Sequence, residues 1–109
     1  MDASEWLEAR RPAPPVKLAA HLEAAVTEFA SSPNMSLSET LAVAGMAILD
    51  RLTGANAPTS RRAMAKDLLS ADALLTYALE AAAEDCESFA ASAGAIIARV
   101  ASLAPAGKT

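Results

Sequence analysis

The stretch from Ser60 to Glu84 most restricts what this chain can fold into, because it is the longest segment that lacks glycine and proline and keeps a helical periodicity. Its main apolar stripe recurs at spacings of three and four, which place side chains on one face of a helix. That stripe comprises Met64, Leu68, Ala71, Leu75, Leu79 and Ala82. Other apolar side chains lie off the stripe, and a helix that is apolar in several directions is typical of a bundle centre or a subunit interface. We therefore predict a central helix, with Leu69, Leu74 and Tyr77 as interface candidates.

Length and composition predict an all-α fold. At 109 residues the chain can bury one core without a metal or disulfide staple. It contains 29 alanines, the strongest helix former, and no segment has the pattern of a strand. We expect a small helical bundle of four longer helices plus a short N-terminal helix. It would form a single helical domain over residues 1–104, followed by a loose C-terminal tail at 105–109.

The first half of the chain gives two helices separated by a proline-rich turn. Ser4 is a predicted N-cap for a short helix from Glu5 to Arg10, which carries two bulky apolar residues and would serve as an anchor. Residues 11–15, RPAPP, favour extended backbone. The second helix should start at Pro15 or Val16 and run to about residue 30, with one clear apolar face.

A third helix is predicted from Leu37 to Leu52. Ser36, followed three residues later by Glu39, has the spacing of a capping box at its start. Gly54 is placed to end it in a left-handed conformation. Thr59 or Ser60 can then cap the central helix.

The last helix is predicted to be separate, because the run AEDCES after Glu84 loses the periodicity. The pattern returns at spacings of four and three that resemble a coiled-coil seam. Its members are Phe89, Ala93, Ile96, Val100 and Leu103. Pro105 should end this helix.

Charge and cysteine content narrow the class of protein. A net charge of −4, a pI near 4.8 and the lack of a basic stripe argue against a nucleic-acid partner. The single cysteine, Cys86, excludes an internal disulfide, and Asp85 and Glu87 beside it disfavour a reactive thiolate. The acidic N-terminus does not match a signal peptide, and residues 88–104 are short and alanine-rich for a membrane span. We expect a cytoplasmic protein with no membrane partner.

Three residues are candidates for a ligand or anion site. Asp72 falls within the apolar stripe by helical counting. It would be a ligand-binding or catalytic group in a bundle cavity, an ion-pair partner across the bundle, a cap, or exposed where the core is thin. Arg61 and Arg62 stand at the start of the central helix, where free amides favour an anion, or they pair with nearby aspartates. His21 has no second histidine or Glu-x-x-His partner, so no metal site is predicted.

One local sequence resembles a known family. The segment Ala71–Glu80, ADALLTYALE, resembles a helix of the trans-isoprenyl diphosphate synthases, where Gly-Asp-Ala-Leu-Leu precedes an apolar helical run, and Arg61-Arg62 is similar to residues upstream of it. Position 71 is alanine where that family has glycine, and the Asp-Asp-x-x-Asp motifs that bind magnesium and diphosphate are missing. The resemblance therefore implies a packing pattern for one helix and no cofactor. In layout the chain also resembles small bacterial all-helical proteins of unknown function.

The sequence points to contacts between proteins more than to chemistry. It has no Gly-x-Ser-x-Gly elbow, phosphate-binding loop or paired-carboxylate motif, so no catalytic residue and no cofactor are predicted. We expect a non-enzymatic helical interaction module that forms a homodimer, with an unidentified protein as a further possible partner. The alternative is a bundle that binds a small ligand or an anion through Asp72 or the Arg61-Arg62 pair.

Overall fold

The computed structural model describes residues 2–29 and 34–103, which form four helices and no strand. They are α1 (Ala3–Glu8), α2 (Val16–Phe29), α3 (Leu37–Thr53) and α4 (Arg61–Leu103). This confirms the all-α class. The expected end of the second helix at residue 30 and the tail at 105–109 lie outside the described residues.

The predicted break after Glu84 is wrong, because α4 continues through it as one helix of 43 residues. The run AEDCES has no glycine or proline, and its alanine and glutamates are good helix formers, so the helix persists although the apolar pattern weakens. The described residues therefore form three longer helices and a short one, and Cys86 lies on the exposed surface of α4.

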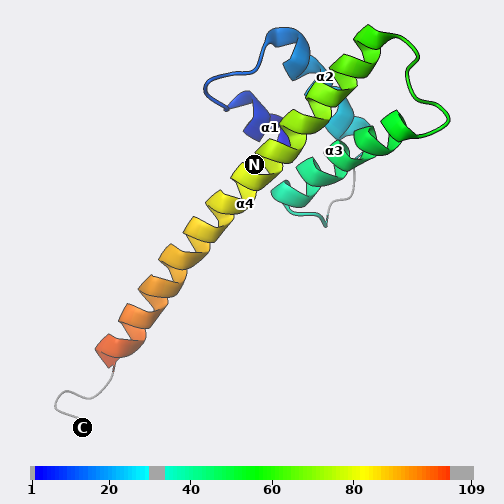
Figure 1. Cartoon of the computed structure of the whole chain (residues 1–109). Coiled ribbons are helices and arrows are strands. Elements are labelled where there is room, and N and C mark those ends of the chain that lie inside the picture. The colour runs from blue at the N-terminus through cyan, green and yellow to red at the C-terminus, as the bar shows by residue number, and fades with distance from the viewer. Residues whose placement is uncertain (1, 30–33, 104–109) are drawn as a thin grey trace.

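Helices α1 to α3 gather around the first half of α4, and the second half projects away from them (Figure 1). The Cα radius of gyration is 19.6 Å, whereas a compact domain of this length has an expected radius of gyration of about 13 Å. We call α1–α3 together with the part of α4 up to Glu84 the head, and residues 85–103 the distal segment.

Local capping explains where the helices begin and end. Asp2, and not Ser4, caps α1 by accepting a 2.9 Å hydrogen bond from the Glu5 amide, so that helix starts earlier than predicted. Ser36 caps α3 as predicted, since the Glu39 amide donates to Ser36 Oγ at 3.2 Å. The Glu39 carboxylate accepts a hydrogen bond of 3.1 Å from the Ser36 hydroxyl, whereas a complete capping box would have it accept from the Ser36 amide.

The structure also shows how α3 ends and α4 begins. Gly54 adopts an extended backbone with φ of −96°, so the predicted left-handed conformation is wrong, although its amide does bond to the Arg51 carbonyl. At the start of α4, Ser60 Oγ accepts a hydrogen bond of 3.0 Å from the Ala63 amide. Of the two predicted caps for this helix, Ser60 is therefore the one that the structure shows.

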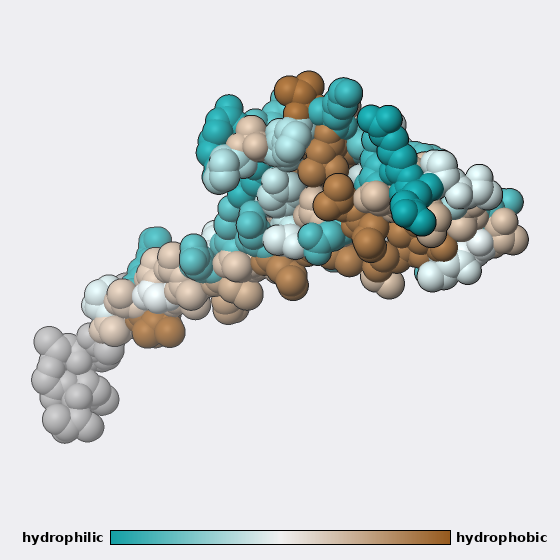
Figure 2. Space-filling view, turned by 45° about the horizontal axis from the view of Figure 1, so that its top comes forward, coloured by the Kyte–Doolittle hydropathy of each residue, from teal (hydrophilic) through white to brown (hydrophobic). Residues whose placement is uncertain are grey.

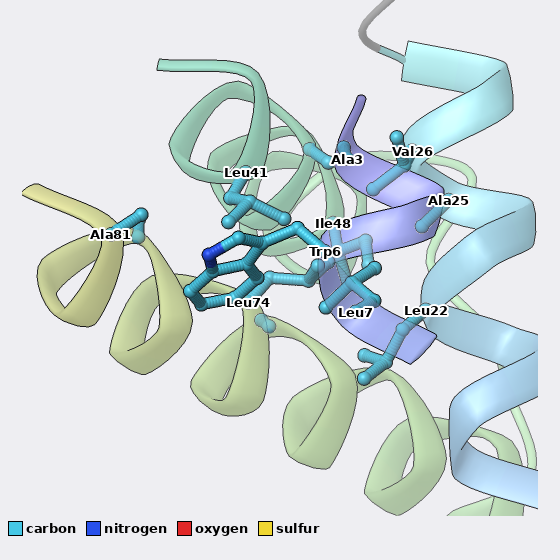
Figure 3. Packing of buried hydrophobic residues seen from close by; sticks show 13 residues of the cluster. Ala3, Trp6, Leu7, Leu22, Ala25, Val26, Leu41, Ile48, Leu74 and Ala81 are labelled. Carbon is cyan, nitrogen blue, oxygen red and sulfur yellow. The ribbon is translucent and has the colours of Figure 1, made fainter. Parts of the chain in front are cut away.

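The core lies between helices α1–α3 and the face of α4 that carries small residues. Trp6 sits at its centre and is 3% exposed, with Leu41, Leu74 and Ala81 around it (Figure 3). On α4 the buried residues recur at spacings of three and four, and they are Asp67, Ser70, Ala71, Leu74, Ala78 and Ala81. Only one of these, Leu74, is a large apolar side chain.

The predicted core stripe of α4 is therefore largely wrong. Met64, Leu68 and Leu79 are 43%, 57% and 73% exposed, and only Ala71 of that stripe is buried. The reason is the close approach of α3 at Gly45, where a Cβ atom would lie 3.0 Å from Leu75 Cγ. Small residues on the facing side allow this approach, and the bulkier side chains of α4 point elsewhere.

We expect Leu74→Ala to lower the free energy of unfolding by about 2–5 kcal/mol, because Leu74 is fully buried and the change leaves a cavity. Leu79→Ala, on the same helix and 73% exposed, should cost about 0.5 kcal/mol or less. Urea unfolding followed by circular dichroism measures both. Equal losses would contradict this placement of the core.

Candidate interaction surface

The carboxylate that α4 buries is Asp67, not Asp72. Asp67 is 4% exposed, whereas Asp72 is exposed, about 140° further around the helix. Arg51 of α3 holds Asp67 with two hydrogen bonds, from Nε to Oδ2 at 3.2 Å and from Nη2 to Oδ1 at 3.0 Å. His21 Nε2 of α2 lies 3.2 Å from the same Oδ1. The cluster therefore links α2, α3 and α4, and both oxygens of the Asp67 carboxylate have hydrogen-bond partners.

The predicted anion-site residues do not form one site. Arg61, Arg62 and Asp72 are all exposed, and Asp72 lies about 16 Å along the helix axis from Arg61. Arg61 borders an apolar hollow of about 480 Å³ between the end of α3 and the start of α4. Arg62 borders a different hollow of about 290 Å³, together with His21, Lys66 and Asp67. In that second hollow the buried carboxylate offsets the cations around it.

The three predicted interface residues also differ in how exposed they are. Leu74 is completely buried in the head, so it is wrong as an interface residue. Tyr77 is half-buried, and its ring packs edge-to-face on Trp6 with centroids 5.8 Å apart. Leu69 is 60% exposed and is the one candidate of the three that faces solvent.

An apolar seam that includes one charged residue, Asp72, runs along α4, and most of its side chains are exposed. It follows steps of three and four residues, as in a coiled coil, and we call it the α4 seam. Its members are Leu68, Asp72, Leu75, Leu79, Ala82, Cys86, Phe89, Ala93, Ile96 and Val100. Figure 2 shows apolar side chains along the protruding helix as well as on the head.

The seam is most exposed in the distal segment. Phe89 is 75% exposed, Ile96 61% and Val100 62%, with Ile97 beside them at 68%. A Cβ atom added at Gly94 would meet nothing within 4 Å. The sequence pattern indicates this seam from Phe89 onward. Its continuation into the head was missed because a break in the helix was predicted after Glu84.

The distal segment of α4 carries three charged side chains. The distal segment has acidic residues at its start, Asp85 and Glu87, and a basic one, Arg99, near its end, all exposed. Among the described residues, no group of three or more potential ligands could hold a metal ion. None of the four helices has the length and apolarity needed to cross a membrane.

Where the head ends, Glu84 anchors α1 to α4. Its carboxylate accepts hydrogen bonds of 3.1 Å from the Trp6 indole and 3.1 Å from Arg10 Nη1, whose guanidinium stacks 3.6 Å from the Trp6 ring centre. The indole and then the guanidinium hold the pKa of Glu84 below its ordinary value of 4.5, because both favour the ionised form.

We expect Asp67→Ala to lower the free energy of unfolding by about 1–3 kcal/mol, because Arg51 would lose its carboxylate partner at a partly buried position. Asp72→Ala, an identical change at an exposed site on the same helix, should shift it by about 0.5 kcal/mol or less. Chemical denaturation of both variants makes the comparison. A larger effect at Asp72 would show that the wrong aspartate has been assigned to the core.

The acid sensitivity of the head should depend on Glu84. Its folded-state pKa is lowered, so the stability from its ionised form is present above the unfolded-state pKa and is lost as the pH falls through the folded-state pKa. Glu84→Gln should therefore lose less stability than the native protein between about pH 6 and about pH 3. Thermal unfolding across that range measures the difference, with Glu87→Gln as the control. A native-like acid response in Glu84→Gln would contradict the assignment.

Comparison of the chain with models of protein families, with curated proteins and with solved structures gives no match in any of the three.

Proposed function

We propose that this protein is a non-enzymatic helical interaction module that works as a homodimer through the exposed α4 seam. The observation that carries the proposal is a row of large apolar side chains that α4 exposes to solvent, with Phe89 at 75% and Leu79 at 73% exposed. Monomeric soluble proteins rarely leave such a contiguous apolar surface in water, and large patches of this kind mark sites of association.

The exposed area is large enough for a stable interface. The accessible surface is 7596 Å², whereas a compact monomer of 11.1 kDa is expected to expose about 5,700 Å². The difference between these two areas is larger than the area that a stable interface covers on each partner, which is about 800 Å². The elongated shape therefore leaves more surface accessible than one interface of that size covers.

The energy available is also of the right size. Four bulky side chains of the distal segment are exposed in each copy, namely Phe89, Ile96, Ile97 and Val100. Complete burial of one such side chain contributes about 1.5–3 kcal/mol. Eight in a dimer would supply about 12–24 kcal/mol at full burial, against an association cost of about 4–15 kcal/mol. Partial burial of the set thus supports a dimer of moderate affinity.

The test is the mass in solution. Light scattering of the full chain should give twice the monomer mass of 11.1 kDa. Ile96→Asp places a charge in the seam and should shift the protein to monomer, because burying an unpaired carboxylate is costly. Ala91→Asp adds the same charge on the opposite side of the helix and should leave the dimer intact. A native chain that stays monomeric at high concentration would refute the proposal.

A further inference from the structure

The distal segment carries an arrangement of apolar and charged residues that specifies how two copies would meet. We propose that residues 85–103 of two copies pair antiparallel, with Phe89 of each opposite Val100 of the other and Asp85 of each beside Arg99 of the other. This inference rests on the proposed homodimer and assigns its orientation and register.

The apolar layers fit this register. The alternating steps of three and four residues give the seam two kinds of position. In an antiparallel pair of helices, a residue at one kind of position packs against a residue at the other kind. Phe89 then meets Val100 of the second copy, and Ala93 meets Ile96 of the second copy. Each large side chain at one end of the overlap thus faces a large one, and each alanine faces an isoleucine. The layers are filled without two bulky groups competing at the centre.

The charges favour the same register. Asp85 and Arg99 both occupy the seam-flanking position that precedes a seam residue, on the same side of the helix. The twofold symmetry of the dimer therefore forms the pair of Asp85 with Arg99 of the second copy twice. Moving the register one heptad toward the head would place Asp85 against Ser92 and Arg99 against Ala78, and moving it two heptads would place the two Asp85 residues against each other. The proposed register is the one of these three that pairs the charges.

The head limits how far a second helix can run along α4. Leu75 is half-buried, and its Cγ lies 3.0 Å from where a Cβ of Gly45 would be, so α3 already occupies part of that side of α4. Ala71 and Ala78, which hold the flanking position in the head, are buried. Beyond residue 84 the same positions are exposed. The second copy therefore fits along the distal segment, which is about 28 Å long as a helix.

A charge-swap cycle tests the pairing. Asp85→Arg alone and Arg99→Asp alone should each raise the dimer dissociation constant about tenfold, because each creates two like-charge contacts. The double variant restores opposite charges and should return to within about threefold of the native value. Within one chain the two residues lie about 21 Å apart along the axis, so any coupling between them has to cross the interface. Sedimentation equilibrium at low salt measures all four constants.

A matched control separates the pairing from net charge. Glu87→Arg makes the same change in charge two residues further on, at a position that faces away from the seam, and should leave the dissociation constant within about twofold of the native value. Circular dichroism on every variant checks that α4 keeps its helix content.

Cys86 gives an independent reading of orientation. It is an exposed seam residue, so a parallel, in-register dimer would hold the two thiols face to face, and a short bis-maleimide would join them. In the antiparallel register, each Cys86 lies near the end of the other helix, so the two thiols are about 26 Å apart and should not cross-link.

The outcomes separate this inference from the proposed function. A dimer that shows the charge coupling and no Cys86 cross-link supports both. A dimer without the coupling, or with efficient Cys86 cross-linking, overturns the antiparallel register and leaves the homodimer in place. A chain that is monomeric throughout overturns both.

Discussion

The close approach of α3 and α4 decides what the rest of the molecule hides and exposes. Gly45 on α3 leaves no room for a side chain toward Leu74 and Leu75, and the facing side of α4 is made mainly of serine and alanine. Close-packed helices gain dispersion contacts over their backbones, but alanine removes little apolar area from water. The head therefore depends on a few large residues, above all Trp6 and Leu74, and the bulky side chains on the other face of α4 remain outside.

This packing also explains the two polar anchors of the head. At one end of the α3–α4 contact, which is short of bulk, Arg51, Asp67 and His21 form a hydrogen-bonded cluster that also includes α2. At the other end, Glu84 binds Trp6 and Arg10 and holds α1 across the last turns of the head. A partly buried charge pair adds little net stability, but removing one partner is costly because the other charge is left uncompensated. Past Glu84 no comparable anchor joins α4 to the described part of the head.

The sequence predicted the helical class, the Ser36 cap of α3 and a cap of α4 at Thr59 or Ser60, because these depend on local spacing and helix propensity. It did not predict which face of α4 is buried. Periodicity reports that Leu68 and Leu79 share a face, but whether that face meets α3 or solvent depends on the small residues opposite, which carry a weak hydrophobic signal. The same error moved the buried carboxylate from Asp67 to Asp72. The break after Glu84 was predicted from fading periodicity, yet propensity alone keeps that segment helical.

Helix cooperativity links the two halves of α4. An isolated helix of the length of the distal segment is marginal in water, since nucleation is costly and most helical stability in proteins comes from packing. Here the head supplies the nucleus, and the alanine-rich sequence lets the helix propagate outward without tertiary support. Its outer turns then gain the most from a partner, because pairing would convert exposed Ile96 and Val100 into packed residues. Association and helix formation in the distal segment would therefore strengthen each other.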